Sequence, residues 1–293
     1  MVRKTDDKNK RGMGAIYNDI LYHGRDNRFW IYSKYMYFHK GLSLYNSAMI
    51  VLQRPGAGYV ATKDEWAQYN RKVMQSASAI NILRPFYPTV AMYEYSDTAL
   101  IADCEDLTPD RFKTISPHNK CEKFDDKWLY LFKNILFKLG IAFREDMNSA
   151  NLGGTATYLT EAIRLYPEIK NNKTVTKFII SVRASDDESE KARTILHETA
   201  HILCGHLGTD SGNKKCVPVD RENMFLQKDA KHIAEYEAEL TCDAVCKILG
   251  IENDSKKYLE FWKYHGETPN YNRGIVLDTA DKILQAIDRK YCW

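Results

Sequence analysis

Residues 197–201 read His-Glu-Thr-Ala-His, a spacing that can hold a metal ion. On a helix, residues four apart lie on one face, so His197 and His201 can both reach a single zinc ion. Glu198 between them can accept a proton from a zinc-bound water. Such a triplet also arises by accident in a chain of 293 residues, on a solvated helix that happens to carry two histidines. The neighbouring residues decide between these interpretations.

The flanking sequence favours the metal interpretation. Apolar residues on both sides of the motif predict a half-buried helix: Ile195, Leu196, Ile202 and Leu203. Acidic residues within 186–190 precede it, as is typical near a helix N-terminus. Gly205 and Gly208 follow, where such a helix can stop. We therefore expect Zn²⁺ as the cofactor.

A catalytic zinc ion needs a third protein ligand and an open position for water. The best donor segment is residues 231–246, which contains no Gly or Pro and predicts a second helix. Glu235 and Glu239 lie one turn apart there. If Glu235 binds the metal, Glu239 can accept the spare ring N–H of a ligand histidine. Glu235 is preferred, Glu237 and Glu239 are alternatives, and the competing interpretation makes all three surface acids.

Other possible ligands fit less well. His206 follows His201 by five residues, about 500° around a helix, which takes it off the metal face. His232, one turn before Glu235, is expected at the surface. The seven cysteines form no C-x-x-C pair, and their odd number argues against a secreted disulfide protein. Three of them are expected to pack as small hydrophobic residues: Cys204, Cys242 and Cys246.

Composition predicts a soluble globular protein. Hydrophobic residues make up 44% and charged residues 28% of the chain, enough for a buried core. No apolar run approaches the length of a membrane span, so no membrane partner is expected. Residues 1–8 are charged and no apolar stretch follows, which differs from a signal peptide. We therefore expect a cytoplasmic protein.

Charge is uneven along the chain. Residues 1–93 hold 14 Lys and Arg against 6 Asp and Glu, a balance of +8, whereas the whole chain is at +3. This asymmetry predicts two domains with different partners. The basic part is also rich in Tyr, Phe and Trp, and aromatic rings beside cations suit single-stranded nucleic acid. An aromatic core with a solvated basic face is the alternative.

Hydrophobic periodicity predicts the elements that carry these residues. The first part of the chain has predicted helices at 14–40 and 43–52, strands at 59–61 and 80–83, and a short helix or turn at 63–69. Residues 104–122 are polar, contain two prolines and are interpreted as the linker. The second part has a predicted helix at 127–139, strands beginning at 141, 155 and 177, the two zinc helices, and two closing helices within 255–290. An extended peptide can pair with a strand just before the metal helix.

From Lys127 onward the chain resembles the ImmA/IrrE-type metallopeptidase family. The resemblance rests on the H-E-x-x-H motif, on residues 235–239 and on the closing helix with Tyr258 and Trp262. The family's usual third ligand is a glutamate three residues before an alanine, which implies Glu235, and its outer acid falls on Glu239. The resemblance implies a zincin-like fold and peptide hydrolysis.

Residues 38–66 resemble the N-terminal domain of ArdC-like antirestriction proteins, which is associated with single-stranded DNA binding. Asn46, Gln53-Arg54-Pro55 and Trp66 match features typical of that domain. Its usual Lys-Gly-Glu-Lys-Gly run is replaced here by the uncharged residues 74–79. The candidate DNA contacts are Lys40, Asn46, Arg54, Trp66, Arg71 and Lys72.

Together these observations predict an α+β protein. Residues 1–115 form a small basic α+β domain that binds single-stranded DNA, and residues 116–293 form a zincin-like metallopeptidase domain with helices on a small, mostly antiparallel sheet. The predicted function is zinc-dependent hydrolysis of a protein substrate, coupled to DNA binding, in an antirestriction or regulatory role of a mobile element or phage. The alternatives are a protective DNA-binding protein without proteolysis and a repressor-cleaving peptidase whose first domain binds protein.

Overall fold

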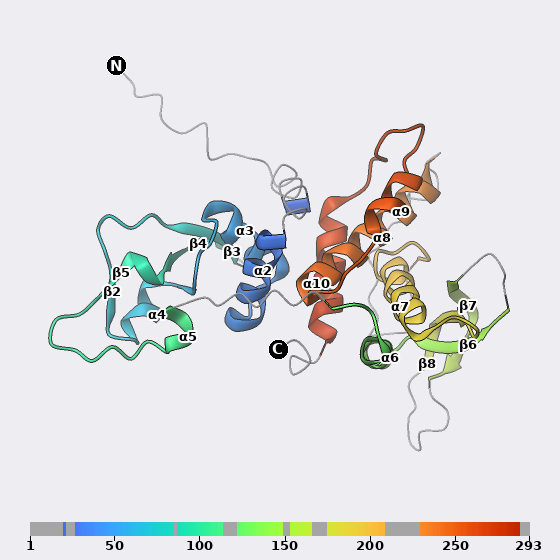
Figure 1. Cartoon of the computed structure of the whole chain (residues 1–293), viewed down its shortest axis with the longest axis horizontal. Coiled ribbons are helices and arrows are strands. Elements are labelled where there is room, and N and C mark those ends of the chain that lie inside the picture. Colours follow the sequence, from blue (N-terminus) through green and yellow to red (C-terminus); the bar gives the residue numbers. More distant parts are fainter. Residues whose placement is uncertain are drawn as a thin grey trace. The chain divides into compact units, whose positions relative to one another are not determined.

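The computed structural model describes residues 20–21, 27–84, 87–113, 122–148, 153–165, 175–208 and 229–287. The chain divides into two compact units, residues 1–120 and residues 121–293. Both units combine helices with small sheets, which confirms the predicted α+β character (Figure 1). Among the described residues, no helix combines the length and apolarity that a bilayer crossing requires.

The first unit combines short helices with two small antiparallel sheets. Its helical elements are α2 (Asn27–Tyr35), the π-helical turn η1 (Met36–Lys40), α3 (Leu44–Gln53), α4 (Lys63–Ala67), the 3-10 turn η2 (Tyr95–Asp97) and α5 (Asp110–Lys113). Its strands are β1 (Val60–Ala61), β2 (Arg71–Val73), β3 (Ile80–Arg84), β4 (Tyr87–Glu94) and β5 (Thr98–Leu100). The strand orders are β1-β4-β3 and β2-β5. Of the helix predicted at 14–40, residues 14–19 and 22–26 lie outside the described residues.

Two side-chain amides attach α3 to β3, at the edge of the first sheet. The Asn46 amide donates to the carbonyl of Leu83 and accepts from its N–H, both at 2.9 Å. Gln53, two turns later, makes the same pair of bonds with Asn81, at 2.8 and 2.9 Å. These bonds satisfy backbone groups that would otherwise remain unpaired at the sheet edge. Asn46 and Gln53 therefore have a structural role.

The stretch interpreted as a linker contributes to the core of the first unit. Phe112 in α5 is buried and stacks on Tyr59, with ring centroids 3.6 Å apart. The Tyr35 hydroxyl donates to the Arg111 carbonyl at 2.6 Å. The prediction was therefore wrong for residues 104–113, because one aromatic anchor outweighs the polar composition around it. Residues 114–121 lie outside the described residues.

The second unit packs helices against a three-stranded sheet. Its helices are α6 (Asp126–Leu139), α7 (Glu188–Leu203), α8 (Ala230–Leu249), α9 (Ser255–Phe261) and α10 (Arg273–Ala286). Its strands are β6 (Ala142–Met147), β7 (Gly154–Arg164) and β8 (Val175–Arg183). The central strand β8 pairs in parallel with β6 and antiparallel with β7. The strand before the metal helix thus has both edges occupied, and the expectation that a peptide pairs there is wrong.

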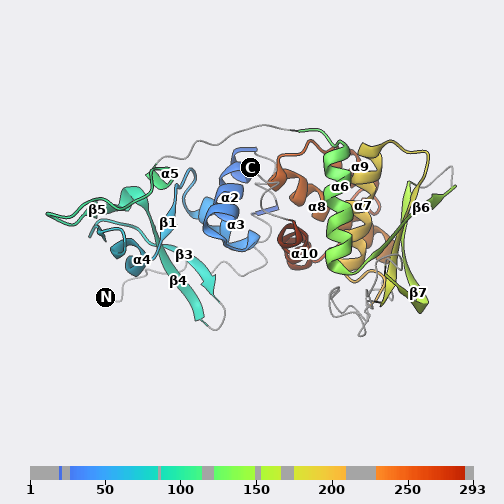
Figure 2. The same ribbon diagram turned by 90° about the horizontal axis from the view of Figure 1, so that it is seen from below.

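The H-E-x-x-H motif lies on α7, which is placed between the sheet and α8 (Figure 2). The Asp187 side chain caps this helix by accepting the N–H of Glu190 at 2.8 Å. Helical spacing gives α7 a buried face formed by Ala192, Ile195, Leu196, Thr199, Ala200, Ile202 and Leu203. Burial of that face fixes the side of the helix on which the motif's other side chains project.

Strand β7 approaches α7 closely at Gly154. A Cβ atom at this position would lie 2.3 Å from Thr194 Cγ2 and 3.0 Å from the Ser181 carbonyl oxygen. Non-bonded carbon atoms pack at about 3.5–4.0 Å, so a side chain here would require Thr194 or the strand to shift. The glycine therefore lets the start of β7 lie against the helix one turn before the motif.

Candidate metal centre

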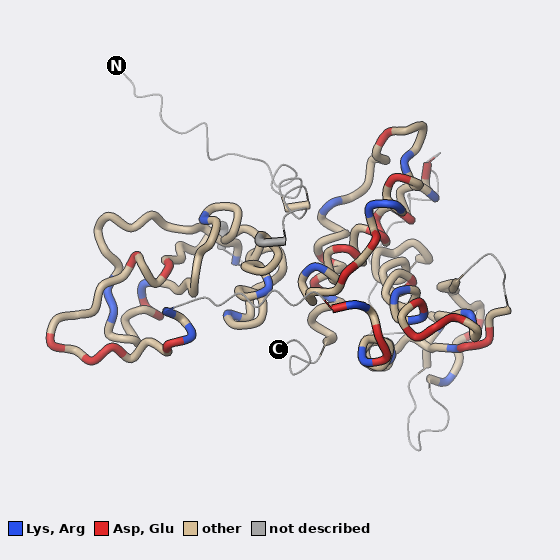
Figure 3. The backbone as a smooth tube through the Cα atoms, viewed as in Figure 1, with Lys and Arg blue, Asp and Glu red and all other residues tan. Residues whose placement is uncertain are grey.

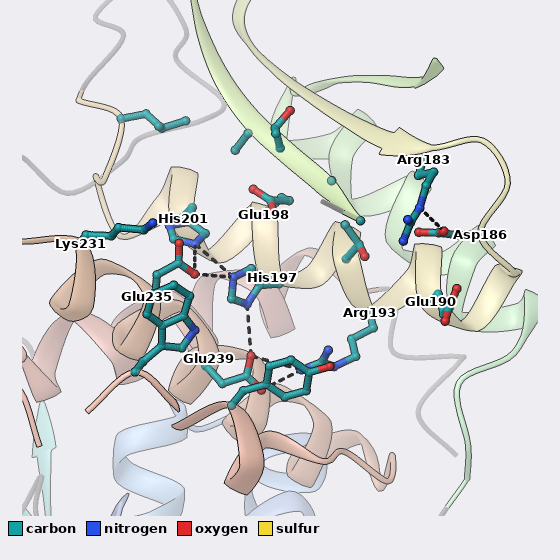
Figure 4. A pocket seen from close by; sticks show the side chains of 18 residues that line it. Arg183, Asp186, Glu190, Arg193, His197, Glu198, His201, Lys231, Glu235 and Glu239 are labelled. Atoms are coloured by element: carbon teal, nitrogen blue, oxygen red, sulfur yellow. Dashed lines mark hydrogen bonds and ion pairs between the residues drawn. The ribbon is translucent and has the colours of Figure 1, made fainter. Parts of the chain in front are cut away.

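Two helices bring three potential metal ligands together. His197 and His201 project from α7 and Glu235 from α8 (Figure 4). The two imidazole Nε2 atoms are 3.1 Å apart. Glu235 Oε2 lies 3.3 Å from Nε2 of His197 and 3.4 Å from Nε2 of His201. Within the described ranges, this is the one group of His, Cys, Asp and Glu side chains arranged to hold a metal ion, and it consists of the three predicted ligands.

A tetrahedral zinc ion fits these spacings. Zinc bonds to imidazole nitrogen and carboxylate oxygen are about 2.0–2.1 Å long, which places neighbouring tetrahedral ligands about 3.3 Å apart. The three separations of 3.1, 3.3 and 3.4 Å form a triangle of that size. Two imidazole nitrogens and one carboxylate oxygen are also a donor set of catalytic zinc sites, in which the fourth corner takes water.

The electrostatics of the site favour a positive charge between the ligands. Burial lowers the pKa of His197, but hydrogen bonds to Glu235 and Glu239 outweigh burial and raise it to about 9. Burial raises the pKa of Glu235, but hydrogen bonds to the two histidines hold it well below its ordinary value. These shifts favour a protonated His197 beside an ionised Glu235, so in the absence of a cation a proton supplies the positive charge.

Glu239 fixes the ring of His197. Its Oε2 lies 3.3 Å from His197 Nδ1, and its side chain is buried. Arg193, one turn before His197, donates through Nη2 to both Glu239 oxygens at 3.1 and 3.3 Å. Its guanidinium lies 4.0 Å from the ring centroid of Tyr258. A bond from Nδ1–H to this carboxylate selects the tautomer that leaves Nε2 free for a metal, the arrangement that the sequence predicts for Glu239.

His206 contacts His201, although helical spacing had placed it elsewhere. Helix α7 ends at Leu203, and Gly205 adopts a φ of +80°, so the chain turns back and the His206 N–H donates to the His201 carbonyl at 3.1 Å. The Nδ1 atoms of the two rings are 2.9 Å apart. His206 therefore lies off the metal face, as predicted, but the turn at Gly205 places it there and not a rotation of about 500° along a continuing helix. Gly205, a recognised helix terminator, was the signal that could have shown this.

Glu237 supports His206 and does not face the metal position. Its Oε2 lies 3.0 Å from His206 Nε2, and its Oε1 accepts the Asn272 N–H at 2.6 Å. Glu237 and Glu239 are both buried, so the interpretation of these acids as surface residues is wrong. The three acids of α8 thus differ in what they face: Glu235 faces Nε2 of both histidines, Glu239 faces Nδ1 of His197 and Glu237 faces His206.

A cavity of about 710 Å³ opens beside these ligands. Glu198 lines it, and among the described residues none donates a hydrogen bond to its carboxylate. Glu198 and Glu239 lie on opposite sides of the histidine pair, and Lys231 extends towards the ligands (Figure 4). Tyr258 and Trp262 form an aromatic wall, and residues 153–156 bring the start of β7 to the rim. The site therefore combines three donor atoms at the spacing of zinc ligands with the Glu198 carboxylate and space for a substrate.

His232 is half-buried, contrary to prediction. Its Nδ1 lies 3.1 Å from the Trp262 carbonyl oxygen. Its ring meets Trp262 and Tyr264 edge-on, with centroids 5.9 and 5.1 Å apart. The segment after α9 covers it, which periodicity within α8 could not reveal. Three cysteines are buried, as predicted: Cys204, Cys242 and Cys246.

Several candidate DNA contacts are instead held inside the first unit. Trp66 is 0% exposed and donates its indole N–H to the Tyr93 carbonyl at 2.8 Å, so it cannot stack on a base. Arg71 is 7% exposed and bonds to Asp106 at 3.0 Å. Asn46 is held by β3. The assignment of Trp66 and Arg71 as DNA contacts was therefore wrong, because aromatic and basic composition does not separate a core from a binding face.

The remaining candidates divide between paired and exposed side chains. Lys40 bonds to Glu65 at 2.6 Å, and Arg54 forms a short ion pair with Asp97. Lys72 on β2 is exposed. Acidic residues lie among the basic ones along this unit (Figure 3). Of the basic candidates, Lys40, Arg54 and Arg71 are thus paired with acids, and Lys72 remains accessible.

No protein-family model matches the chain, and no curated protein matches it. Among solved structures, the metal-free crystal structure of the antirestriction ArdC protein from the R388 plasmid is similar over 94% of this chain and 94% of that chain. The sequence identity is 11% and the TM-score is 0.38.

Proposed function

We propose that the chain is a zinc-dependent peptidase in which His197, His201 and Glu235 hold the ion. The observation that carries this proposal is the convergence of three ligand atoms, 3.1 to 3.4 Å apart, beside an available carboxylate in an open cavity. A zinc ion bound there supplies a Lewis acid that polarises the scissile carbonyl and lowers the pKa of water.

Glu198 is the proposed general base. Its carboxylate lines the cavity next to the ligand histidines. There it accepts a proton from the attacking water and delivers it to the leaving nitrogen, which avoids the expulsion of an unstable amide anion. Glu239 and Arg193 act behind the site by holding His197 in the metal-binding tautomer.

The substrate is proposed to lie along β7. This strand is at the edge of its sheet, and residues 153–156 line the cavity. An extended peptide can pair with such an edge through backbone hydrogen bonds, which brings one of its carbonyls beside the ligands. The contact at Gly154 keeps this edge close to the metal helix. A site of this kind favours an extended protein segment over a folded surface.

Glu198→Gln tests the proposal, with Glu190→Gln as the matched control. Both substitutions remove one negative charge from residues of α7 that line the same cavity. We expect both variants to retain one zinc ion per chain by elemental analysis. Glu198→Gln alone should lose about 10²-fold or more in hydrolysis of a fluorogenic peptide library. Undiminished cleavage by Glu198→Gln contradicts the proposal. So does a wild-type chain that holds no zinc after incubation with zinc and removal of the unbound ion.

A second proposal is an antirestriction role that uses single-stranded DNA binding without hydrolysis. The observation that favours it is the balance of +8 in residues 1–93, which suits a nucleic-acid partner. Gel-shift titration of a single-stranded oligonucleotide with full-length Glu198→Gln tests it. Binding that weakens with salt supports phosphate contacts, and absence of binding at low salt contradicts them. Coupling of the two activities requires that the oligonucleotide change the rate of peptide hydrolysis by the wild-type chain.

A further inference from the structure

Each ligand histidine has a partner at the ring nitrogen that faces away from the metal position. For His197 this partner is Glu239. For His201 it is His206, which in turn contacts Glu237. We propose that His206, held by Glu237, is a positioning residue that sets the tautomer and ring orientation of His201 for metal binding. The inference rests on the proposed zinc site and is independent of whether the site hydrolyses peptides.

The direction of each hydrogen bond follows from the metal-facing atom of His201. Its Nε2 lies among the ligand atoms, so in the metal-bound form Nε2 carries no proton and Nδ1 carries one. The Nδ1–H then donates to Nδ1 of His206 at 2.9 Å. A His206 ring that accepts at Nδ1 carries its proton on Nε2, which donates to Glu237 Oε2 at 3.0 Å. One tautomer of each ring therefore satisfies every atom of the chain of hydrogen bonds.

Glu237 is itself fixed by another helix. Its Oε1 accepts the N–H of Asn272, the N-cap residue of α10, at 2.6 Å. The network thus joins the turn after α7 to α8 and α10. It also explains why His206 is not a fourth ligand, since its Nδ1 faces the far side of the His201 ring and its Nε2 faces Glu237.

A buried polar network of this kind is weak evidence for a purely stabilising role. His206 is 4% exposed and Glu237 is 0% exposed. Burial of a carboxylate is unfavourable unless it is hydrogen-bonded, and apolar replacement of a buried polar group is often neutral for stability. Orientation of His201 gives His206 and Glu237 a role, because a hydrogen-bond partner at the ring nitrogen that does not face the metal changes metal affinity.

Zinc affinity of full-length variants tests the inference, measured by competition with a chromophoric chelator. His206→Leu removes both hydrogen bonds, whereas His206→Asn keeps an oxygen acceptor near the position of Nδ1. His39→Leu, at a half-buried histidine of the first unit, is the control. We expect His206→Leu to bind zinc about 10- to 100-fold more weakly than wild type, His206→Asn to fall between them and His39→Leu to match wild type. Cobalt-loaded His206→Leu should also show altered visible absorption bands, because the geometry of His201 changes.

The outcomes separate this inference from the proposed function. Wild-type zinc affinity and an unchanged cobalt spectrum in both His206 variants overturn the role of His206 and leave the zinc site standing. A wild-type chain that binds no zinc overturns both. If circular dichroism shows that His206→Leu does not fold, Glu237→Gln takes its place, since it keeps side-chain size but offers one acceptor oxygen. Weaker zinc binding is expected there, and unchanged binding overturns the inference.

Discussion

Gly154→Ala should strain the contact between strand β7 and the metal helix. The new methyl group would lie 2.3 Å from Thr194 Cγ2, where about 3.5–4.0 Å is normal, so either the Thr194 side chain must rotate or the two elements must separate by roughly 1.2 Å. Overpacking of this kind costs about 1–3 kcal/mol. For a unit of this size, that corresponds to a loss of about 2–12 °C in Tm. Thermal unfolding of the metal-free chain measures it.

Gly153→Ala is the control, because its Cβ would lie 3.4 Å from Thr194 Oγ1 and 3.6 Å from Asp186 Oδ2, close to ordinary contact distances. It should change stability by less than about 0.5 kcal/mol. Thr194→Ser removes the clashing methyl group, so the double variant with Gly154→Ala should recover part of the loss. The Ser181 carbonyl, 3.0 Å from the new Cβ, limits that recovery. Equal stability of the two glycine variants, or a double-mutant cycle without coupling, would refute the reasoning.

The other predictions concern the ligand environment and the first unit. Glu239→Gln should lower zinc affinity about 10- to 100-fold in a chelator competition, because Nδ1 of His197 loses its charged partner; unchanged affinity contradicts this. In the metal-free fold, the pKa of His197 is raised from 6.5 to about 9, so its proton contributes stability that is fully present below pH 6.5 and is lost as pH rises through 9. Zinc displaces this proton, so zinc affinity should rise up to about tenfold per pH unit between pH 6.5 and 9. Calorimetry of zinc binding in buffers of different ionisation enthalpy measures the released proton, and absence of proton release contradicts the prediction. Trp66→Ala should cost about 3–5 kcal/mol in urea unfolding. Lys72→Ala should leave stability within about 0.5 kcal/mol of wild type and reduce the salt dependence of single-stranded DNA binding. If Trp66→Ala instead left stability unchanged and weakened DNA binding, Trp66 would be a surface contact.

The convergence of His197, His201 and Glu235 could be predicted in part, because it depends on local helical geometry. Two histidines four residues apart must lie on one face of α7, whereas the acid of α8 that faces them was left open between Glu235, Glu237 and Glu239, with Glu235 preferred. The same geometry predicts Glu239 one turn further along. For His206 the predicted outcome, that it is not a ligand, is right but the reason is not, because a side chain after a helix end is placed by the turn and not by the helical period. Glu237 was unpredictable for a related reason, since its partners come from that turn and from α10.

In the first unit, amino-acid composition does not predict which basic and aromatic side chains are exposed. Trp66, Arg71 and Lys72 have the residue types of a DNA-binding surface, yet two of them are buried. The acids that pair with the basic side chains, such as Asp97 and Asp106, come from segments distant in sequence. Pairing across the fold, and not local pattern, decides whether a cation faces solvent. The same holds for Phe112, whose burial turns part of a polar stretch into core.

Anomalous diffraction at the zinc edge from crystals of the zinc-loaded chain would locate the ion. We expect a single strong peak about 2.0–2.1 Å from Nε2 of His197, Nε2 of His201 and a carboxylate oxygen of Glu235. A peak bound by Glu237, Glu239 or His206 in place of any of these, or no peak at this triangle, would contradict the proposed site.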